Sequence, residues 1–462
     1  MLVDKNDDRK FLSDKEADRR LTGVRQGRLT MYDKISVVRF VYCYFRDWYK
    51  YKTETQRLKM CFGEVRKGSD IMDFYKRALE LKGETIAHRR YLHENAEVGL
   101  DMPMAREYVN KTLSECGIEP KECGYGVTAL LGKGDKTLLL RADMDALPMP
   151  EESGEPFACC TGKQAHACGH DFHAAMLLTA AKLLKENESL LQGQVKLMFQ
   201  PAEETFEGSC NMIENGILEN PHVDAALAYH IAPGRLPIGL FMYNSGGVMM
   251  SSVDGFRITI KGKGGHGAYP NLAVDPVHTA VQIYTALEGL IAREANPEKT
   301  CVLTVGKFQA GNAPNIIPDT AEIEGTLRTN DKDARELLVR RISEVAVTIA
   351  KMNGAEAEIT RLSQVPTLMC DAKLTDQMAG FMTEMSVPGI TPYPGMQANA
   401  SEDFANVAEK VPSTLMYLSA GFNDERGDYS AHNPKVRFNE EVCPIGAAAL
   451  AHCAVRWLET AE

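Results

Sequence analysis

Residues 136–148, KTLLLRADMDALP, decide the fold class, because they join an apolar run to a pair of acidic residues at its end. The run TLLL is continuous rather than alternating, which is typical of a strand in a sheet covered on both faces. A second run of this kind extends from Gln194 to Phe199. The segment between them has helical spacing of its apolar residues, at Ala174, Leu177, Leu178, Ala181 and Leu184. This strand, helix, strand alternation predicts an α/β domain on a mostly parallel sheet.

The pattern changes near Ser251, where Phe256 to Ile260 begins to alternate with period two. The predicted elements from there are strand 256–260, helix 276–293, strands 301–308 and 320–328, helix 333–352 and strand 355–361. This βαββαβ order predicts a ferredoxin-like α+β unit inserted into the first domain. The predicted organisation is an N-terminal extension (1–71), a catalytic domain in two parts (72–250 and 363–462) and the insertion (251–362).

The composition excludes several classes of protein. The chain has 52 Lys+Arg against 63 Asp+Glu, a net charge of −11, which argues against a general nucleic-acid binder. The 12 cysteines lack the spacing of a disulfide scaffold, and the first residues are charged, so we expect a reducing cytoplasm. No stretch is apolar enough for a membrane span. We read 1–71 as a helical appendage or a leader that is not native; its aromatic and basic residues leave nucleic-acid or membrane-surface binding as an alternative.

The segment HACGHDFH (166–173) is the strongest chemical signal. On a helix, Cys168 and His170 would point about 200° apart, so they share a ligand only if this piece is a turn or extended. Gly169 permits such a turn. Thiolate and imidazole together favour zinc, and added carboxylates widen the choice towards manganese. The alternative is a helix start with incidental histidines.

Two acidic pairs also follow predicted buried strands. In QPAEE (200–204), Pro201 ends the strand and lets Glu203 and Glu204 turn towards the crevice at its carboxyl end. One carboxylate could bind metal while the other takes a proton from water, although an ordinary solvated loop is the alternative. Asp143 and Asp145 could belong to a metal site, where they would bind the metal or orient its ligands. The alternative is that they cap a helix or stabilise a turn.

His230 follows the apolar run 225–229 at a predicted strand end, and His432 lies in AHNP. Each alone is readily structural, but the recurrence of such groups in one sheet is hard to explain by chance. The predicted ligands are five, enough for two metals sharing a bridging group at about 3.5–4 Å: Cys168, His170, Glu204, His230 and His432.

These motifs, and the order in which they follow one another along the chain, resemble those of the aminoacylase and carboxypeptidase family of metal-dependent amidohydrolases. The similar subgroup is that of hippurate hydrolase, auxin-conjugate hydrolase and N-acetyldiaminopimelate deacetylase. The resemblance covers about Asp73 to Trp457. It is carried by RADMDALP (141–148), HACGHDFH (166–173), QPAEE (200–204), KGKGGHGAYP (261–270), NIIPD (315–319), GTLR (325–328), SEDF (401–404) and HNPK (432–435).

The resemblance implies two divalent metals per subunit, zinc or manganese with cobalt or nickel as alternatives, and an inserted lid domain through which a homodimer forms. It implies the same five ligands, with Glu203 as general base and Asp143, Asp145 and Asp171 as supporting residues. His266 would reach a neighbouring subunit's active site to support the developing oxyanion, and Asn315 and Arg328 would line the carbonyl or carboxylate end of the substrate. The chain departs from the family pattern at Ala96, Tyr269 and Ala400, which leaves substrate preference open.

The predicted activity is hydrolysis of the amide bond of N-acylated amino acids, acetyl or benzoyl among them, by metal-activated water with Glu203 as general base. A dipeptidase or carboxypeptidase using the same site is the alternative within enzymes. A catalytically silent metal-binding interaction protein is a further one, against which the spare carboxylate of Glu203 argues.

Overall fold

The computed structural model describes residues 73–159, 161–385, 387 and 389–460. The predicted N-terminal extension, 1–71, lies outside the described residues. Within the described part of the chain, no helix is long and apolar enough to cross a lipid bilayer.

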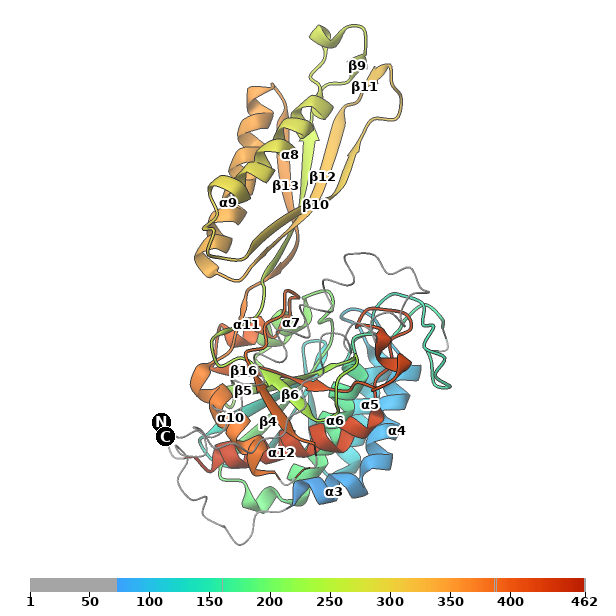
Figure 1. The fold of residues 1–462 in the computed structure, drawn as a ribbon, viewed down its shortest axis with the longest axis vertical. Helices are drawn as coiled ribbons and strands as arrows, with labels where there is room; N and C mark the ends of the chain where they lie inside the picture. The colour runs from blue at the N-terminus through green and yellow to red at the C-terminus, as the bar shows by residue number, and fades with distance from the viewer. Residues whose placement is uncertain (1–72, 160, 386, 388, 461–462) are drawn as a thin grey trace, which may run out of the picture. The chain divides into compact units, whose positions relative to one another are not determined.

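An eight-stranded sheet organises the part of the fold that carries the predicted ligands (Figure 1). Its central strands β4, β3, β5 and β16 run parallel, whereas the pairs β1 with β2, β2 with β4, and β16 with β6 are antiparallel. The mostly parallel sheet predicted from the sequence is therefore confirmed. In spatial order the strands are β1 (Pro120–Cys123), β2 (Gly126–Gly132), β4 (Gln194–Gln200), β3 (Thr137–Asp143), β5 (Ala225–Ala232), β16 (Ser413–Ser419), β6 (Leu240–Tyr243) and β15 (Thr391–Pro394).

Strand β3 shows why its sequence is apolar without alternation. Leu138 and Leu140 belong to the hydrophobic core on one face of the sheet, whereas Leu139 belongs to the core on the other face. Since successive side chains of a strand point to opposite faces, a strand covered on both sides needs apolar residues at every position. All residues of β3 are buried.

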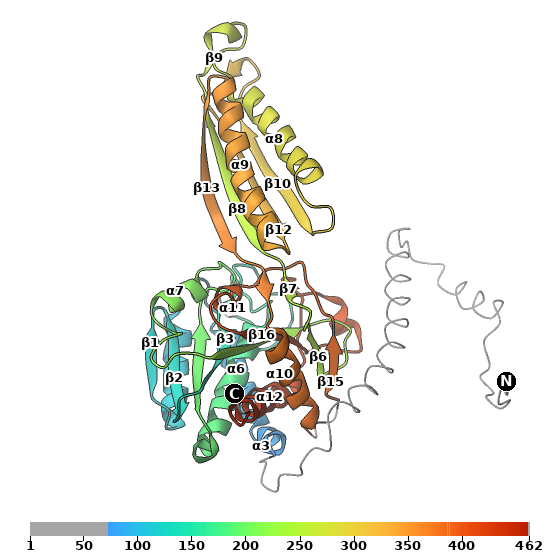
Figure 2. The ribbon, with the colours of Figure 1, turned by 90° about the vertical axis from the view of Figure 1, so that its left-hand side faces the viewer.

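Helices cover both faces of this sheet (Figure 2). On one face, α6 lies against α12 and α4, and nearly all of its residues are buried. The helices contributing to this core are α3 (Phe74–Glu80), α4 (Lys82–Glu94), α5 (Pro103–Glu115), α6 (His170–Glu186), α10 (Ala372–Glu384) and α12 (Cys443–Leu458). The core of the other face includes residues of the short helices α7 (Gly208–Glu214) and α11 (Ala405–Ala408).

The segment between β7 (Val248–Met250) and β14 (Leu368–Met369) forms a second sheet with two helices. The strands stand in the spatial order β10, β12, β8, β13, and each neighbouring pair is antiparallel. Along the chain, its main strands and helices follow the predicted βαββαβ order, with these bounds: β8 (Val253–Lys261), α8 (Pro276–Arg293), β10 (Cys301–Ala310), β12 (Thr320–Thr329), α9 (Lys332–Met352) and β13 (Glu356–Val365).

The two helices of this inserted unit cover one face of its sheet. Ile258 and Ile323 from the strands pack with Ile283 of α8 and Leu338 of α9. The alternating strand pattern seen in the sequence follows from this arrangement, because only one face is covered. Strands β7 and β14 pair with each other where the chain enters and leaves the inserted unit.

Candidate metal centre

The acidic groups of the centre lie at the carboxyl ends of two neighbouring parallel strands. Asp143 is the last residue of β3, and Asp145 follows two residues later. Glu203 and Glu204 lie in a turn that begins after β4 and Pro201. The carboxyl ends of parallel strands meet at one edge of the sheet, which is where ligands bind in open α/β folds.

The turn predicted between Cys168 and His170 is present. Gly169 has φ 94°, in the left-handed region, and His170 is the first residue of α6. A Cβ atom on Gly169 would lie 2.5 Å from Cδ1 of Ile231, so both conformation and space require glycine here. The turn leaves the two side chains free to face a common point.

The two remaining histidines differ in how well their position was predicted. His230 lies inside β5 rather than beyond its end, because β5 continues to Ala232 in register with β16. His432 lies in the loop before α12, with φ 62°, and its side chain is half exposed.

The donor atoms of these segments converge on the thiol of Cys168. Its Sγ lies 3.4 Å from Nε2 of His230 and 3.3 Å from Nε2 of His432. The same Nε2 of His432 lies 3.3 Å from Oε1 of Glu204. Cys168, His170 and His230 form one set whose donor atoms lie within 4.8 Å of one another, and Cys168, Glu204 and His432 form another. Cys168 is common to both of these sets, so its thiol would belong to the group of residues that holds the metal ions.

Hydrogen bonds at the second ring nitrogen fix which nitrogen of each histidine faces the cluster. His230 donates from Nδ1 to the carbonyl of Ile231 at 2.7 Å, and His170 Nδ1 lies 3.2 Å from Oδ1 of Asp145. Both therefore keep Nε2 for a ligand, as is usual for histidines that bind metals. His173 is different, because its Nε2 accepts the backbone N–H of Ile231 at 2.8 Å and its Nδ1 lies 2.5 Å from Asp143. Both of its nitrogens are occupied.

The cluster fits divalent metal ions. Nε2 of His170 is buried without a hydrogen-bond partner among the described residues, although three carboxylates lie 3.5–4.0 Å away. A buried polar atom without a partner is costly, and a cation at this point would satisfy it. Burial raises the pKa of Cys168 to about 12, because the thiolate is costly in this buried place. A metal ion bound to the sulfur would supply the positive charge that stabilises the thiolate.

Glu203 belongs to neither set that contains Cys168, but it forms a third set with His170 and Glu204 and a fourth with Glu402 and Asp403. Its side chain is buried, Oε1 accepts the backbone N–H of Asp403 at 3.3 Å, and Oε2 lies 3.9 Å from Nε2 of His170. Burial, together with the charges of Glu402 and Asp403, raises the pKa of Glu203 well above its usual value. A carboxyl group of this kind can both accept and return a proton.

The supporting aspartates fall into two groups. Asp145 contacts His170 and also accepts the backbone N–H of Glu204 at 3.0 Å, so it orients two predicted ligands. Asp143 contacts His173 and lies 3.5 Å from His170 Nε2. Asp171 contacts Arg89 and His93 of α4.

A buried guanidinium for which no role was predicted lies among the carboxylates of the centre. Arg141, on β3, lies 2.8 Å from Asp143 and 2.8 Å from Glu402, and donates to Asp403 at 3.1 Å and to Gln200 at 2.9 Å. The motifs RAD and SED contain these residues. The signal that could have revealed them is an arginine inside an otherwise apolar strand, since such a residue is almost never buried unless paired.

The predicted residues of the inserted unit form contacts of their own. His266 is exposed in the two-residue strand β9 (Gly265–His266), which pairs with β11 (Ile316–Ile317), and Gly267 donates its N–H to the carbonyl of Asn315 at 2.9 Å. His266 and Asn315 are thus neighbours. Arg328 donates from Nη1 to Oγ of Ser401 at 2.5 Å, next to Glu402.

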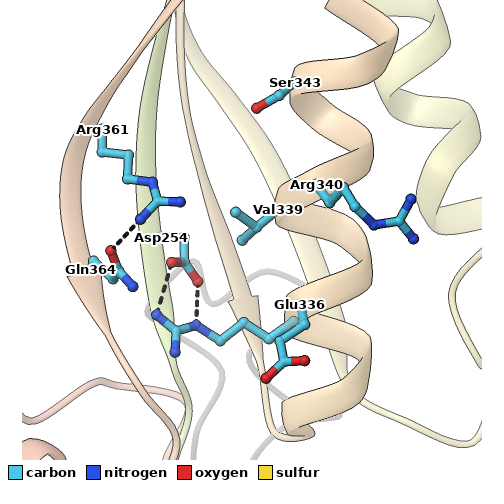
Figure 3. A pocket seen from close by; sticks show the side chains of 8 residues that line it. Asp254, Glu336, Val339, Arg340, Ser343, Arg361 and Gln364 are labelled. Carbon is cyan, nitrogen blue, oxygen red and sulfur yellow. Dashed lines mark hydrogen bonds and ion pairs between the residues drawn. The ribbon is translucent and has the colours of Figure 1, made fainter.

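A cavity of about 470 Å³ lies within the inserted unit, between α9 and the strands β8 and β13 (Figure 3). Arg335 donates to both carboxylate oxygens of Asp254, at 2.7 and 2.9 Å, and Arg361 donates to Gln364 at 2.8 Å. None of the predicted site residues lines this cavity. Arg335 and Arg361 are thus paired with neighbouring side chains of the same unit.

An α/β sheet with a buried thiol, imidazole and carboxylate cluster at its carboxyl edge has the site of a metal-dependent hydrolase. Comparison with known families agrees. Residues 139–456 match the family described as peptidase family M20/M25/M40, and the chain belongs to this family.

The relatives include enzymes that act on N-acyl compounds. N-acetyl-L-cysteine deacetylase of Bacillus subtilis (strain 168) is 35% identical over 386 residues, which cover 83% of this chain and 90% of that protein. Hippurate hydrolase of Campylobacter jejuni subsp. jejuni is 34% identical over 394 residues, covering 84% and 100%. The crystal structure of the Bacillus subtilis YXEP protein, a dinuclear metal binding peptidase from the M20 family, matches with a TM-score of 0.69 and 32% identity, covering 83% and 100%. The chain is thus a hydrolase of a family that acts on amide bonds, and the resemblance seen in the motifs is confirmed.

Proposed function

We propose that the protein hydrolyses the amide bond of N-acylated amino acids, with acetyl and benzoyl groups as candidate acyl groups. The observation that carries the proposal is Glu203, a buried carboxyl group held by the backbone N–H of Asp403 with its Oε2 3.9 Å from Nε2 of His170, and outside the two sets that share Cys168 although it forms a further set with His170 and Glu204. A purely structural zinc site is closed by its ligands and has no use for such a group. The names of the two N-acyl relatives support the substrate class.

We propose Cys168, His170, Glu204, His230 and His432 as the ligands of two divalent ions, zinc or manganese, with cobalt or nickel as substitutes. The bound ions supply Lewis acidity, which polarises the acyl carbonyl and makes water a nucleophile near neutral pH. Glu203 takes the proton of the attacking water and returns it to the leaving amine. The backbone N–H of Asp403 orients the carboxylate of Glu203 for both transfers.

Residues 251–362 are proposed as a lid and dimerisation domain, inserted between the two parts of a catalytic domain, 72–250 and 363–462. His266 would support the developing oxyanion in the active site of a second copy of the chain. Asn315 and Arg328 would bind the carbonyl and carboxylate end of the substrate. We also propose a cytoplasmic location, which the nine free cysteines of the described residues support.

The variant Glu203→Gln tests the general base. It keeps the size and hydrogen bonding of the side chain but cannot take a proton, so turnover should fall about 10²–10⁴-fold while two metal ions stay bound. Glu207→Gln is the matched control, because Glu207 lies exposed in the segment after the same turn and contacts Thr205. Unchanged turnover in Glu203→Gln would remove Glu203 from the mechanism.

A panel of substrates tests the substrate class. The metal-loaded protein is assayed with N-acetyl and N-benzoyl amino acids and with dipeptides of the same amino acids. We expect a higher kcat/KM for the acyl compounds. A preference for the dipeptides would reassign the protein as a dipeptidase or carboxypeptidase.

A further inference from the structure

A second buried polar cluster lies directly behind the Cys168 turn, and it includes two cationic side chains of helix α4. Arg89 donates from Nε to Oδ2 of Asp171 at 2.7 Å, and His93 Nδ1 lies 2.8 Å from the same oxygen. On the other side of the ring, His93 Nε2 lies 3.0 Å from Oε1 of Glu151. Arg89, His93 and Asp171 are buried, and the side chain of Glu151 is only 5% exposed.

The geometry indicates that His93 is an imidazolium. A carboxylate oxygen faces each ring nitrogen, and a carboxylate has no proton to donate, so each nitrogen must carry its own. Arg89 Nη2 also lies near His93 Nδ1, but at 3.2 Å it is farther away than the oxygen of Asp171. The neighbouring His166 ring is buried and carries no hydrogen bond at Nδ1 among the described residues.

The charges around His93 agree with this state. Burial acts to lower the pKa of His93, but Asp171 and Glu151 outweigh burial, so its pKa is raised. Burial lowers the pKa of His166 to about 3, so His166 is neutral at physiological pH. Two carboxylates thus face two cations, Arg89 and His93, in this cluster.

Arg89 is fixed by more than its ion pair. Its guanidinium carbon lies 4.6 Å from the ring centre of Phe157 and 4.5 Å from that of Phe172, which is a residue of α6. Its Nη1 also donates to Glu440 at 3.2 Å. Such a planar, paired and stacked guanidinium holds its partners in one geometry.

We propose that Arg89 and His93 are positioning residues of the metal centre: by clamping Asp171 they fix the first turn of α6, and with it the directions of Cys168 and His170. Asp171 directly follows His170, and the turn before it is already restricted at Gly169. Helix α4 lies before residue 139, where the match to the family model begins, so its two side chains reach the Cys168 turn from a distant part of the sequence. The inference rests on the proposed metal ligands.

The test measures the affinity of the full chain for Zn²⁺ by competition with a chromophoric chelator. His93→Gln and Asp171→Asn should each weaken Zn²⁺ binding about 10–100-fold, the usual effect of removing a group that orients a ligand. The double variant should lose no more than the worse single variant, because both changes break the same contact. The control is His88→Gln, on the same helix, since His88 contacts Tyr108 instead of Asp171; its Zn²⁺ affinity should equal that of the unchanged protein.

Two further readouts separate positioning from general damage. The metal-free variants should keep the far-ultraviolet circular dichroism of the unchanged protein. In the unchanged protein, ¹⁵N NMR should show both ring nitrogens of His93 protonated at neutral pH. The proposal is overturned by folded His93→Gln protein with unaltered Zn²⁺ affinity, by an equal loss in His88→Gln, or by a neutral His93 ring. If the unchanged protein itself binds no Zn²⁺, the proposed function fails instead.

Discussion

Gly169 offers a sharp test of how the metal centre is built, because the same substitution at another glycine should have the opposite sign. At φ 94°, alanine in place of glycine costs about 1–2 kcal/mol in backbone strain. The new Cβ would also lie 2.5 and 2.7 Å from two carbons of Ile231 and 3.2 Å from Phe438. Ile231 is wholly buried and has little room to rotate, and such overpacking costs about 1–3 kcal/mol. We therefore expect Gly169→Ala to lower the free energy of unfolding by about 2–5 kcal/mol.

Gly380 is the matched control. It lies within α10 of the same domain, and a Cβ there would have no heavy atom within 4 Å. Alanine in a helix interior is favoured over glycine by about 0.5–1 kcal/mol, so Gly380→Ala should stabilise the protein.

Urea unfolding of the metal-free protein, followed by tryptophan fluorescence, measures both variants. Trp457 lies in α12, within the core that also contains α6, and so reports on the relevant domain. The second of the 2 tryptophans, Trp48, is replaced by phenylalanine in all samples. An unfolding free energy of Gly169→Ala equal to that of the parent protein would refute the close approach to Ile231 and the conformation of the turn.

Two further predictions concern the carboxylates beneath the cluster. Arg141→Met should destabilise the protein by about 3–5 kcal/mol, because it leaves buried carboxylates without their cation, whereas Arg77→Met, which breaks a surface pair with Glu186, should cost at most about 1 kcal/mol in the same urea titration. Burial raises the pKa of Asp403 to about 7 in the folded protein, so this group binds a proton more tightly folded than unfolded, and its contribution to stability should be lost as the pH rises from about 4 to about 7. Asp403→Asn removes that contribution, and the unfolding free energy of the metal-free parent protein minus that of the variant should therefore fall over this range; a constant difference would contradict the assigned environment.

The sequence is sufficient to predict features that depend on local periodicity. The run TLLL in β3 is apolar at each position because Leu138 and Leu139 face different cores, and this is legible without knowing what covers them. The break before α6 is likewise predictable, since Cys168 and His170 share a ligand only in a turn or an extended segment, and Gly169 permits the turn that the structure shows. Both features concern neighbours in the chain.

Features that depend on contacts between distant segments cannot be predicted from the sequence in the same way. HACGHDFH contains three histidines, yet His173 has both nitrogens occupied, by Asp143 of β3 and Ile231 of β5. No spacing rule distinguishes it from His170, because the partners that decide the matter are 30 and 58 residues away. Asp171 is a similar case, since its partners on α4 lie 82 and 78 residues earlier.

Charge balance explains why these distant groups have to be considered together. Among the described residues in contact with the carboxylates of the centre, Arg141 is the buried group of permanent positive charge. The carboxylates are six: Asp143, Asp145, Glu203, Glu204, Glu402 and Asp403. Buried charges of one sign are costly, and this cost raises the pKa values of Glu203 and Asp403, whereas Arg141 beside Asp143 and His432 beside Glu204 help to lower the pKa values of those two groups. Two divalent cations would bring four positive charges, which together with Arg141 would offset most of the charge of the six carboxylates and the Cys168 thiolate. This excess of buried carboxylates beside Cys168 therefore favours the binding of cations there, and the same cations would lower the pKa of Glu203 from its raised value in the metal-free protein.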